Sequence, residues 1–310
     1  MSVSFGLAIK NFVGPTETPD VDAIIAYAER AEQLGFESLW AWDHVILGVE
    51  PAFPIIDALS MLTAIAMRTT RIKLGTGILV LPLRNPTVLA KQIGSIDHIS
   101  KGRFILGTAV GWYAREFGAV GVPFKQRGRI MDRNLEILTR LLTEDRVRLK
   151  EDEFDLRDAR VLPRPVQQPR PPILIGGYVD AVFRRIARYG DGWLTYFYTP
   201  ESFQRTWERI KGFTAEAGRD PATLTATNQL AISVGVDRAE MRHWLETEWD
   251  IASWSESTLD HAIQGSPDEC VEQLKAHVAS GVDRLILIPY RYQPEQVEII
   301  AKEILPRVQG

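Results

Sequence analysis

The sequence predicts an α/β protein built as a (β/α)8 barrel with insertions. Its 310 residues suit a barrel of about 250 residues plus inserted segments. Apolar residues make up 45% and charged residues 25%, as in a globular protein with a large core. Short apolar runs alternate with longer amphipathic segments eight times along the chain. Repeated β-α-β units imply parallel strands with right-handed crossovers, and eight units favour a closed barrel over a doubly wound sheet, which is the alternative.

The elements follow in order. We expect a first strand over residues 3–9 and then a helix that Asp20 caps and Gly35 ends. Pro86 suits the first turn of a later helix, where its missing N–H costs little. The remaining expected strands are 37–41, 71–79, 103–108, 172–175, 192–195, 224–236 and 284–288. The expected helices are 57–67, 86–99, 129–142, 180–189, 200–217, 267–280 and 294–304.

Two segments interrupt this alternation. Residues 145–171 mix charges with prolines and are expected to form a hairpin and a loop. Residues 237–264 are polar but contain Trp244, Trp249 and Trp254. We expect an extra helical segment there, near the face that carries the site, with the tryptophans packing it onto the barrel. Residues 1–310 are thus expected to form one barrel domain with two insertions.

Charge and composition exclude several classes of function. The formal net charge of −4 gives neither a basic surface for nucleic acid nor a polybasic membrane signal. No apolar run reaches the roughly 18 residues that a membrane helix needs, and the first residues do not resemble a signal peptide. The single cysteine, Cys270, rules out an intramolecular disulfide. We therefore expect a cytoplasmic protein that acts on a small molecule, without nucleic acid or membrane partners.

Candidate functional residues follow the predicted strands. In a (β/α)8 barrel the active site lies at the C-terminal ends of the strands. The polar, glycine and aromatic residues found there are Trp42, Asp43 and His44 after the second strand, Thr76, Gly77 and Ile78 at the end of the third, Val110, Gly111, Trp112 and Tyr113 after the fourth, Gly176, Gly177 and Tyr178 after the fifth, and Trp193 to Tyr198 after the sixth.

His44 is the candidate acid or base, because imidazole titrates near neutral pH and both donates and accepts protons. The alternative is a structural hydrogen bond at the rim. Asp43 is a candidate contact for a polar edge of a cofactor, and adjacent residues of a strand end need not touch one another. No pair of histidines has the spacing of a metal site, so no metal is expected.

Gly176 and Gly177 lie between a strand and a helix, where backbone N–H groups approach a phosphate. Arg127 and Arg129 are candidates for pairing with that phosphate, and an exposed position at a helix start is the alternative for Arg129. The chain lacks the Gly-x-Gly-x-x-Gly pattern of a Rossmann site and the Gly-x-Ser-x-Gly pattern of an α/β hydrolase.

Taken together, these motifs resemble the bacterial luciferase-like flavin-dependent oxidoreductases, including their deazaflavin (coenzyme F420) branch. Their order and spacing match over nearly the whole chain. The stretches that carry the resemblance are 41–44 (AWDH), 74–86 (LGTGILVLPLRNP), 100–107 (SKGRFILG), 111–112 (GW), 116–117 (EF), 121–124 (GVPF), 163–167 (PRPVQ), 175–177 (IGG) and 190–193 (GDGW).

The resemblance implies a barrel that binds F420 or FMN at the strand C-termini. It implies a non-prolyl cis peptide at Gly77–Ile78 beneath the cofactor ring, and ring contact or proton transfer by Asp43 and His44. The residues expected to contact the cofactor are Asp43, Thr76, Gly77, Ile78, Val110, Gly111, Trp112 and Tyr178. Gly176 and Gly177 are expected to hold its phosphate, with Arg127 as the phosphate-side arginine. The expected substrate pocket is walled by Trp42, Trp112, Tyr113, Trp193 and Tyr196.

The chain also departs from parts of that family. F420-dependent sugar-phosphate dehydrogenases carry a catalytic glutamate where this chain has Trp112, and Glu116 lies one helical turn further on. FMN monooxygenases often show Glu-His-His after the second strand, whereas this chain has Trp-Asp-His. The first departure argues against a sugar-phosphate dehydrogenase, and the second favours F420 over FMN. We therefore expect F420-dependent hydride transfer to or from a small organic substrate.

Reduced-FMN-dependent monooxygenation is the alternative reaction. A non-catalytic flavin-binding protein is an alternative of another class. A hydrolase or lyase is not favoured, because the sequence shows no arrangement of a nucleophile or of metal ligands that such an enzyme needs. By analogy with the family we expect a homodimer and a separate reductase that supplies reduced cofactor.

Overall fold

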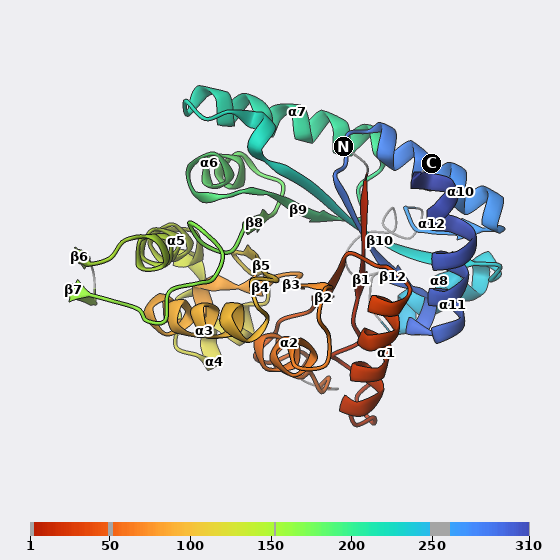
Figure 1. Cartoon of the computed structure of the whole chain (residues 1–310), viewed down its shortest axis with the longest axis horizontal. Coiled ribbons are helices and arrows are strands. Elements are labelled where there is room, and N and C mark those ends of the chain that lie inside the picture. Colours follow the sequence, from red (N-terminus) through yellow and green to blue (C-terminus); the bar gives the residue numbers. More distant parts are fainter. Residues whose placement is uncertain (1–2, 49–51, 152, 249–260, 310) are drawn as a thin grey trace.

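The computed structural model describes residues 3–48, 52–151, 153–248 and 261–309, and it contains a closed barrel (Figure 1). Each barrel strand pairs in parallel with the next along the chain, and the last pairs back with the first. The strands in order are β1 (Ser4–Ala8), β2 (Ser38–Ala41), β3 (Lys73–Thr76), β5 (Phe104–Ala109), β8 (Ile173–Gly176), β9 (Gly192–Tyr196), β10 (Thr225–Val234) and β12 (Arg284–Pro289). The predicted (β/α)8 fold is confirmed.

Helices surround the barrel, and several begin where the sequence indicated. The side chains of Asp20, Asp57, Asn85 and Thr199 accept hydrogen bonds from N–H groups of the first turns that follow them, and Ser266 forms a capping box with Glu269. The helices are α1 (Val21–Gln33), α2 (Ala58–Ala66), α3 (Pro86–Ile99), α4 (Ala114–Ala119), α5 (Arg127–Thr143), α6 (Asp180–Tyr189), α7 (Pro200–Glu216), α8 (Arg238–Glu248), α10 (Pro267–Ala279), α11 (Pro294–Ile299) and α12 (Leu305–Gln309). None of the described helices is long and apolar enough to cross a membrane.

Alternation along the strands separates two apolar cores. One face of each strand packs against the helices, as Leu7, Leu39 and Leu106 do. The opposite face fills the barrel, where the fully buried indole of Trp40 lies. A Cβ on Gly75 would stand 2.4 Å from this indole, and one on Gly6 would stand 2.8 Å from its Nε1. The glycines therefore make room for Trp40, which closes the barrel interior.

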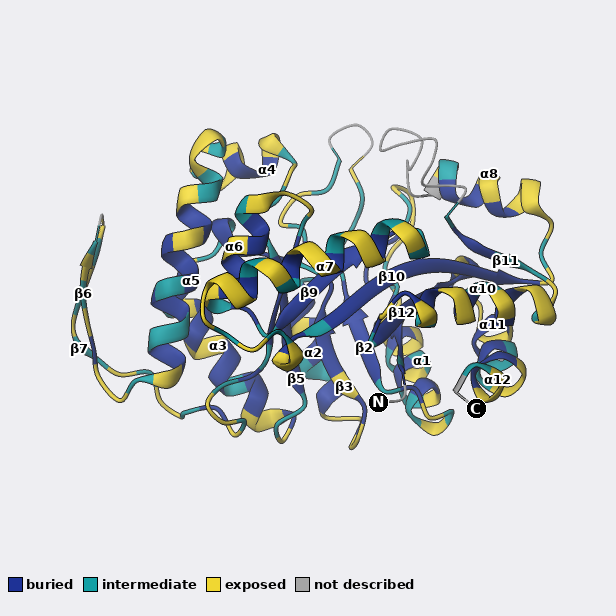
Figure 2. Cartoon of the chain, turned by 90° about the horizontal axis from the view of Figure 1, so that it is seen from above, coloured by how far each residue is buried: buried dark blue, intermediate teal, exposed yellow. Residues whose placement is uncertain are grey.

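The two insertions have different positions. Residues 145–171 contain the antiparallel hairpin of β6 (Val147–Glu151) and β7 (Phe154–Ala159) and then a loop, as predicted. The hairpin lies beside α5 at one end of the molecule (Figure 2). Residues 237–264 contain helix α8 and the strand β11 (Ile263–Gly265), which pairs with β10. Trp244 is fully buried against Tyr290, whereas Trp249 and Trp254 lie outside the described residues.

An ion pair ties the N-terminal ends of two strands together. Glu37 accepts two hydrogen bonds from Arg284, both 3.1 Å long, and one from Lys73. Burial alone raises the pKa of Glu37, but the bonds and charge of Arg284 and the bond from Lys73 outweigh it and lower the pKa from 4.5 to about 2. The pair joins β12 to the start of β2 at the floor of the barrel.

Replacing Glu37 by Gln should therefore lower the free energy of unfolding at pH 7 by roughly 2 kcal/mol, because Arg284 loses its partner. The stabilisation is fully present above the unfolded-state pKa of 4.5 and is lost as the pH falls toward 2, so the deficit of the variant should shrink in that window. Urea unfolding at pH 7 and pH 3 measures this. Glu29→Gln, which breaks an exposed pair with Arg68, is the control and should change little. An equal deficit at both pH values would contradict the assignment.

Candidate active site

The C-terminal ends of the barrel strands form one face of the molecule. Figure 2 shows α4 and α8 above this face at opposite ends, with both chain termini below the barrel. Met241, Trp244 and Leu245 of α8 belong to the same buried cluster as Trp40. The helix therefore extends the inner core over one side of the barrel mouth.

The peptide bond Gly77–Ile78, directly after β3, is cis, as expected. Thr76 precedes it and is fully buried. The Thr76 hydroxyl donates to Gly107 O at 2.7 Å and accepts from Gly107 N at 3.0 Å. Its hydrogen-bonding capacity serves the contact between β3 and β5, so Thr76 acts by holding the strand that carries the cis peptide.

Asp43 is enclosed within the protein. One carboxylate oxygen accepts from Val80 N at 2.9 Å, and the other pairs with Arg84. Burial raises the pKa of Asp43, and the charge of Arg84 and the N–H of Val80 offset part of this effect. The expectation of cofactor contact or proton transfer by Asp43 is therefore not supported. Its carboxylate instead anchors the segment that follows Gly77–Ile78.

His44 lies in a different environment from its neighbour. Its Nδ1 is 3.3 Å from Oε2 of Glu116 on α4, and its ring meets Trp112 edge to face with centroids 6.1 Å apart. The side chain of His44 is 18% exposed and that of Glu116 only 1%. His44 is thus partly open to the mouth on one side and bonded to a buried carboxylate on the other.

The turn after β5 brings several predicted residues to the rim. Gly111 has a φ of +77°, and a Cβ there would stand 2.5 Å from Val80 Cγ1, so glycine is required. Val110 is partly buried against the outer core. The next residue, Trp112, is 57% exposed and packs against Tyr113, with ring centroids 5.5 Å apart. Glycine at this turn therefore lets the chain place Trp112 beside His44.

The turn after β8 contains the two predicted phosphate glycines. A Cβ on Gly176 would lie 3.4 Å from Ile78 Cγ2, so this turn lies against the cis peptide. Gly177 has a φ of +127°. No side chain caps the first turn of α6, which follows it. Val182 N donates to Val179 O, whereas the N–H groups of Asp180 and Ala181 make no hydrogen bond to another described residue and suit an anion.

Trp193 was expected in the substrate pocket, and this prediction is wrong. It is fully buried in the outer core, where it stacks on Phe203 of α7 with centroids 5.0 Å apart. Its Nε1 donates to Gly177 O at 2.8 Å. Trp193 therefore supports the turn after β8 from behind and does not face the barrel mouth.

The other predicted pocket aromatics do reach this face. Trp42 packs against the inner core and donates from Nε1 to Tyr292 Oη at 3.3 Å. Tyr196 and Tyr178 are 46% and 65% exposed. Burial, and then the charge of Tyr178, raise the pKa of Tyr196. An aromatic rim thus partly surrounds the mouth.

The sequence interpretation did not select Gln229, in the middle of β10. A Cβ on Gly77 would stand 3.3 Å from its Oε1, so the amide reaches the cis peptide from across the barrel. The side chain is almost completely buried, and its amide makes no hydrogen bond to another described residue. Period-two alternation places Gln229 on the inward face of β10, level with Tyr196 at the end of β9, and this alternation was the signal available in the sequence.

Arg127 begins α5, where its guanidinium covers the Phe124 ring at 4.0 Å and donates to Phe124 O. Its role at a phosphate remains a prediction.

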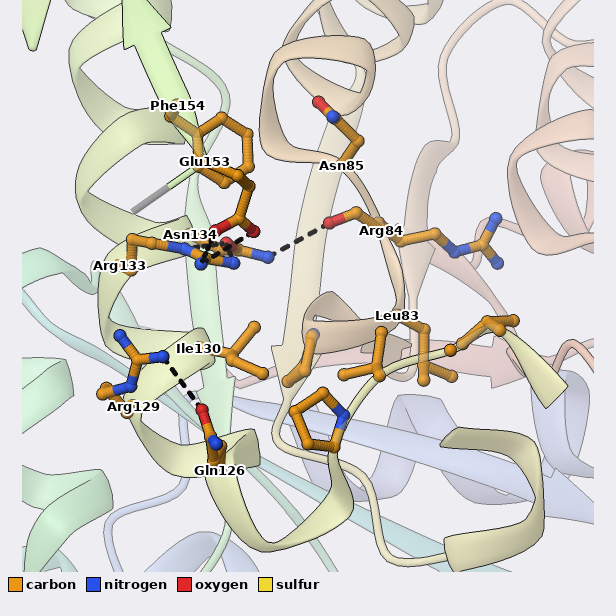
Figure 3. Close-up of a pocket in the computed structure, with 15 residues that line it drawn as sticks. Leu83, Arg84, Asn85, Gln126, Arg129, Ile130, Arg133, Asn134, Glu153 and Phe154 are labelled. Carbon is orange, nitrogen blue, oxygen red and sulfur yellow. Dashed lines mark hydrogen bonds and ion pairs between the residues drawn. The ribbon is translucent and has the colours of Figure 1, made fainter. Parts of the chain in front are cut away.

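Arg129 instead donates to Gln126 and lines a cavity of about 460 Å³ outside the barrel (Figure 3). Arg133 also lines this cavity, where it is held by Glu153 next to the tip of the hairpin. Arg129 is the one predicted site residue that lines this cavity, which lies between residues 82–85, residues 120–134 and the hairpin, away from the barrel mouth.

Among the described residues, no group of His, Cys, Asp or Glu side chains is arranged to hold a metal ion. The chemistry of the mouth therefore comes from an imidazole with a carboxylate partner, an unpaired amide, an exposed aromatic rim and a glycine turn at a helix start. Such a site suits a planar ligand with an anionic tail and a proton-exchanging substrate.

Proteins of similar sequence include enzymes that use F420. The chain is 26% identical to an F420-dependent glucose-6-phosphate dehydrogenase of Amycolatopsis mediterranei, over 93% of this chain and 94% of that protein. It is 34% identical over 166 residues to an uncharacterised protein of Mycobacterium tuberculosis, which is 54% of this chain and 57% of that protein. The chain thus matches little more than half the length of that second relative.

Solved structures share the fold. An F420-dependent secondary alcohol dehydrogenase, solved with an F420-acetone adduct, superposes with a TM-score of 0.85 at 18% identity, over the full length of both chains. The oxygenating constituent of 3,6-diketocamphane monooxygenase from Pseudomonas putida, solved with FMN, gives a TM-score of 0.82 at 19% identity over 99% of each chain. The model of the family described as "Luciferase-like monooxygenase" matches residues 1–284. The chain therefore belongs to the luciferase-like monooxygenase family.

Proposed function

We propose that this protein is an F420-dependent oxidoreductase that moves a hydride to or from a small organic substrate, with His44 exchanging the accompanying proton. The observation that carries the proposal is the placement of His44, held by Glu116 and flanked by Trp112, at the same barrel mouth as the cis peptide Gly77–Ile78. Relatives that use F420 cover nearly all of the chain, and this supports the choice of cofactor.

The residues of the mouth fit such a group. The amide of Gln229 lies beside Gly77, where it can bond the polar edge of a planar ring. The backbone at Gly176 and Gly177, and the uncapped first turn of α6, suit a phosphate. When bound, F420 supplies the acceptor or donor of the hydride. The protein supplies orientation and an aromatic rim that limits access of water.

His44 is the group we assign to the proton. For an alcohol substrate, the hydroxyl proton passes to the imidazole as the C–H bond is broken, and it returns when the carbonyl is reduced. Trp112 and Tyr196 lie at the rim and would contact an apolar part of the substrate.

The second candidate, FMN-dependent monooxygenation fed by a separate reductase, is favoured by relatives such as limonene 1,2-monooxygenase of Rhodococcus erythropolis.

The first test is a fluorescence titration of the purified protein with F420 and with FMN, each in both redox states. We expect saturable F420 binding at micromolar or lower concentration and weaker FMN binding. Selective binding of FMN would replace the proposal by the monooxygenase. Binding of neither would refute both functions and leave only the fold.

The Gln229→Leu variant tests the amide. It should weaken F420 binding about tenfold, because one hydrogen bond to a buried ligand edge is lost. Thermal stability without cofactor should be unchanged or higher, since the amide makes no hydrogen bond to any residue that the structure describes. Thr227→Val is the matched control on the same face of β10. It removes a buried hydroxyl that has no hydrogen-bond partner among the described residues, and it should leave the affinity unchanged. Unaltered binding by Gln229→Leu would place the ring elsewhere.

The His44→Gln variant tests the proton transfer. With a panel of secondary alcohols and their ketones, kcat should fall about 100-fold while F420 affinity changes little. The absorbance of F420 reports the rate. His243→Gln, at an exposed position of α8, is the control and should retain full activity. A variant at His44 that keeps its rate would exclude His44 from the chemistry.

A further inference from the structure

Glu116 is the one acidic side chain in the described residues whose carboxylate contacts His44. It lies on α4 and is 1% exposed. Trp112 occupies the position of the catalytic glutamate of related sugar-phosphate dehydrogenases, and Glu116 lies four residues further on. Its burial at a catalytic candidate calls for a physical explanation, because a lone buried carboxylate is costly.

The bonds of Glu116 supply that explanation. Its Oε1 accepts from the backbone N–H groups of Val45 and Ile46, which follow His44. Its Oε2 faces His44 Nδ1 at 3.3 Å. One carboxylate therefore fixes both the backbone after β2 and the orientation of the imidazole ring.

The chemistry of the contact selects a tautomer. A carboxylate only accepts hydrogen bonds, so Nδ1 must carry a proton to bond with it. In a neutral imidazole the other nitrogen, Nε2, is then an acceptor. We propose that Glu116 is a positioning residue that keeps the proton of His44 on Nδ1 and leaves Nε2 to exchange a proton with the substrate. The second half of this statement rests on the proposed function, and the first half does not.

The same geometry makes Glu116→Gln a directed test. The N–H groups of Val45 and Ile46 require an acceptor, so the glutamine oxygen must take the position of Oε1. Its NH2 group then faces Nδ1 of His44, which has to become the acceptor. The proton of the neutral ring should therefore move to Nε2.

Long-range ¹H–¹⁵N correlation spectra of the protein without cofactor, recorded at alkaline pH, read the tautomer of His44 directly. The His44 signals are assigned by their loss in His44→Gln. We expect Nδ1–H in the wild type and Nε2–H in Glu116→Gln. The variant Asp97→Asn alters another fully buried carboxylate, which is bonded to Gln167, and it should leave the His44 tautomer unchanged.

An Nε2–H tautomer in the wild type would overturn the proposal even if the variant does not fold. An unchanged tautomer in folded Glu116→Gln would overturn it as well. Because neither measurement needs a cofactor or substrate, failure of the proposed function and failure of this proposal are separate results.

Kinetics supply a second readout. Glu116→Gln should lower kcat about 100-fold and change KM little, as expected for loss of a correctly oriented base. In the double variant with His44→Gln the loss should not exceed that of His44→Gln alone, because Glu116 acts through His44. Additive losses would show that Glu116 acts independently of His44 and would overturn the positioning role.

Discussion

The filling of the barrel by Trp40 is the constraint on which the rest of this structure depends. The indole occupies the interior because β1 and β3 have glycine at the two facing positions, and its N–H is bonded to Ser38. A filled interior leaves the C-terminal end as the place where strand residues meet a ligand. Gly77 and Gln229 lie at this end, so the floor of the site and the core of the barrel are continuous. Substitutions in the core therefore reach the site through a few tightly packed contacts.

Asp43 and His44 illustrate how adjacent residues acquire different tasks. The strand end directs one side chain into the protein, toward Val80 and Arg84, and the other toward Glu116 and the mouth. The first carboxylate stabilises the chain after the cis peptide, whereas the imidazole remains partly open. The two neighbouring residues, just after the end of β2, thus differ in role: Asp43 supports the chain from within, and His44 is left at the mouth, where we propose that it exchanges a proton.

The sequence predicted the barrel and both insertions, because these depend on local patterns of apolar and polar residues. The cis peptide was implied by the resemblance to the luciferase-like family. The sequence did not predict the orientation of Trp193, since a strand buried on both faces shows no polar alternation that distinguishes inside from outside. Glu116 was also missed as a partner of His44. The two residues are 72 positions apart in the chain, and only the closed barrel brings α4 over the end of β2. The short strands β4 (Leu79–Val80) and β11 have too few residues to produce a periodic signal.

The exposed rim has a consequence for the evolution of this fold. Trp112, Tyr178 and Tyr196 keep about half or more of their surface in contact with solvent, whereas the residues that hold the mouth together, such as Thr76 and Asp43, are buried. Replacement of a rim aromatic removes little packing and so has a small effect on stability. Substitutions of the rim aromatics can therefore accumulate and change which substrates bind, while selection preserves buried residues such as Thr76 and Asp43. A family built in this way can diversify its chemistry without first acquiring surplus stability.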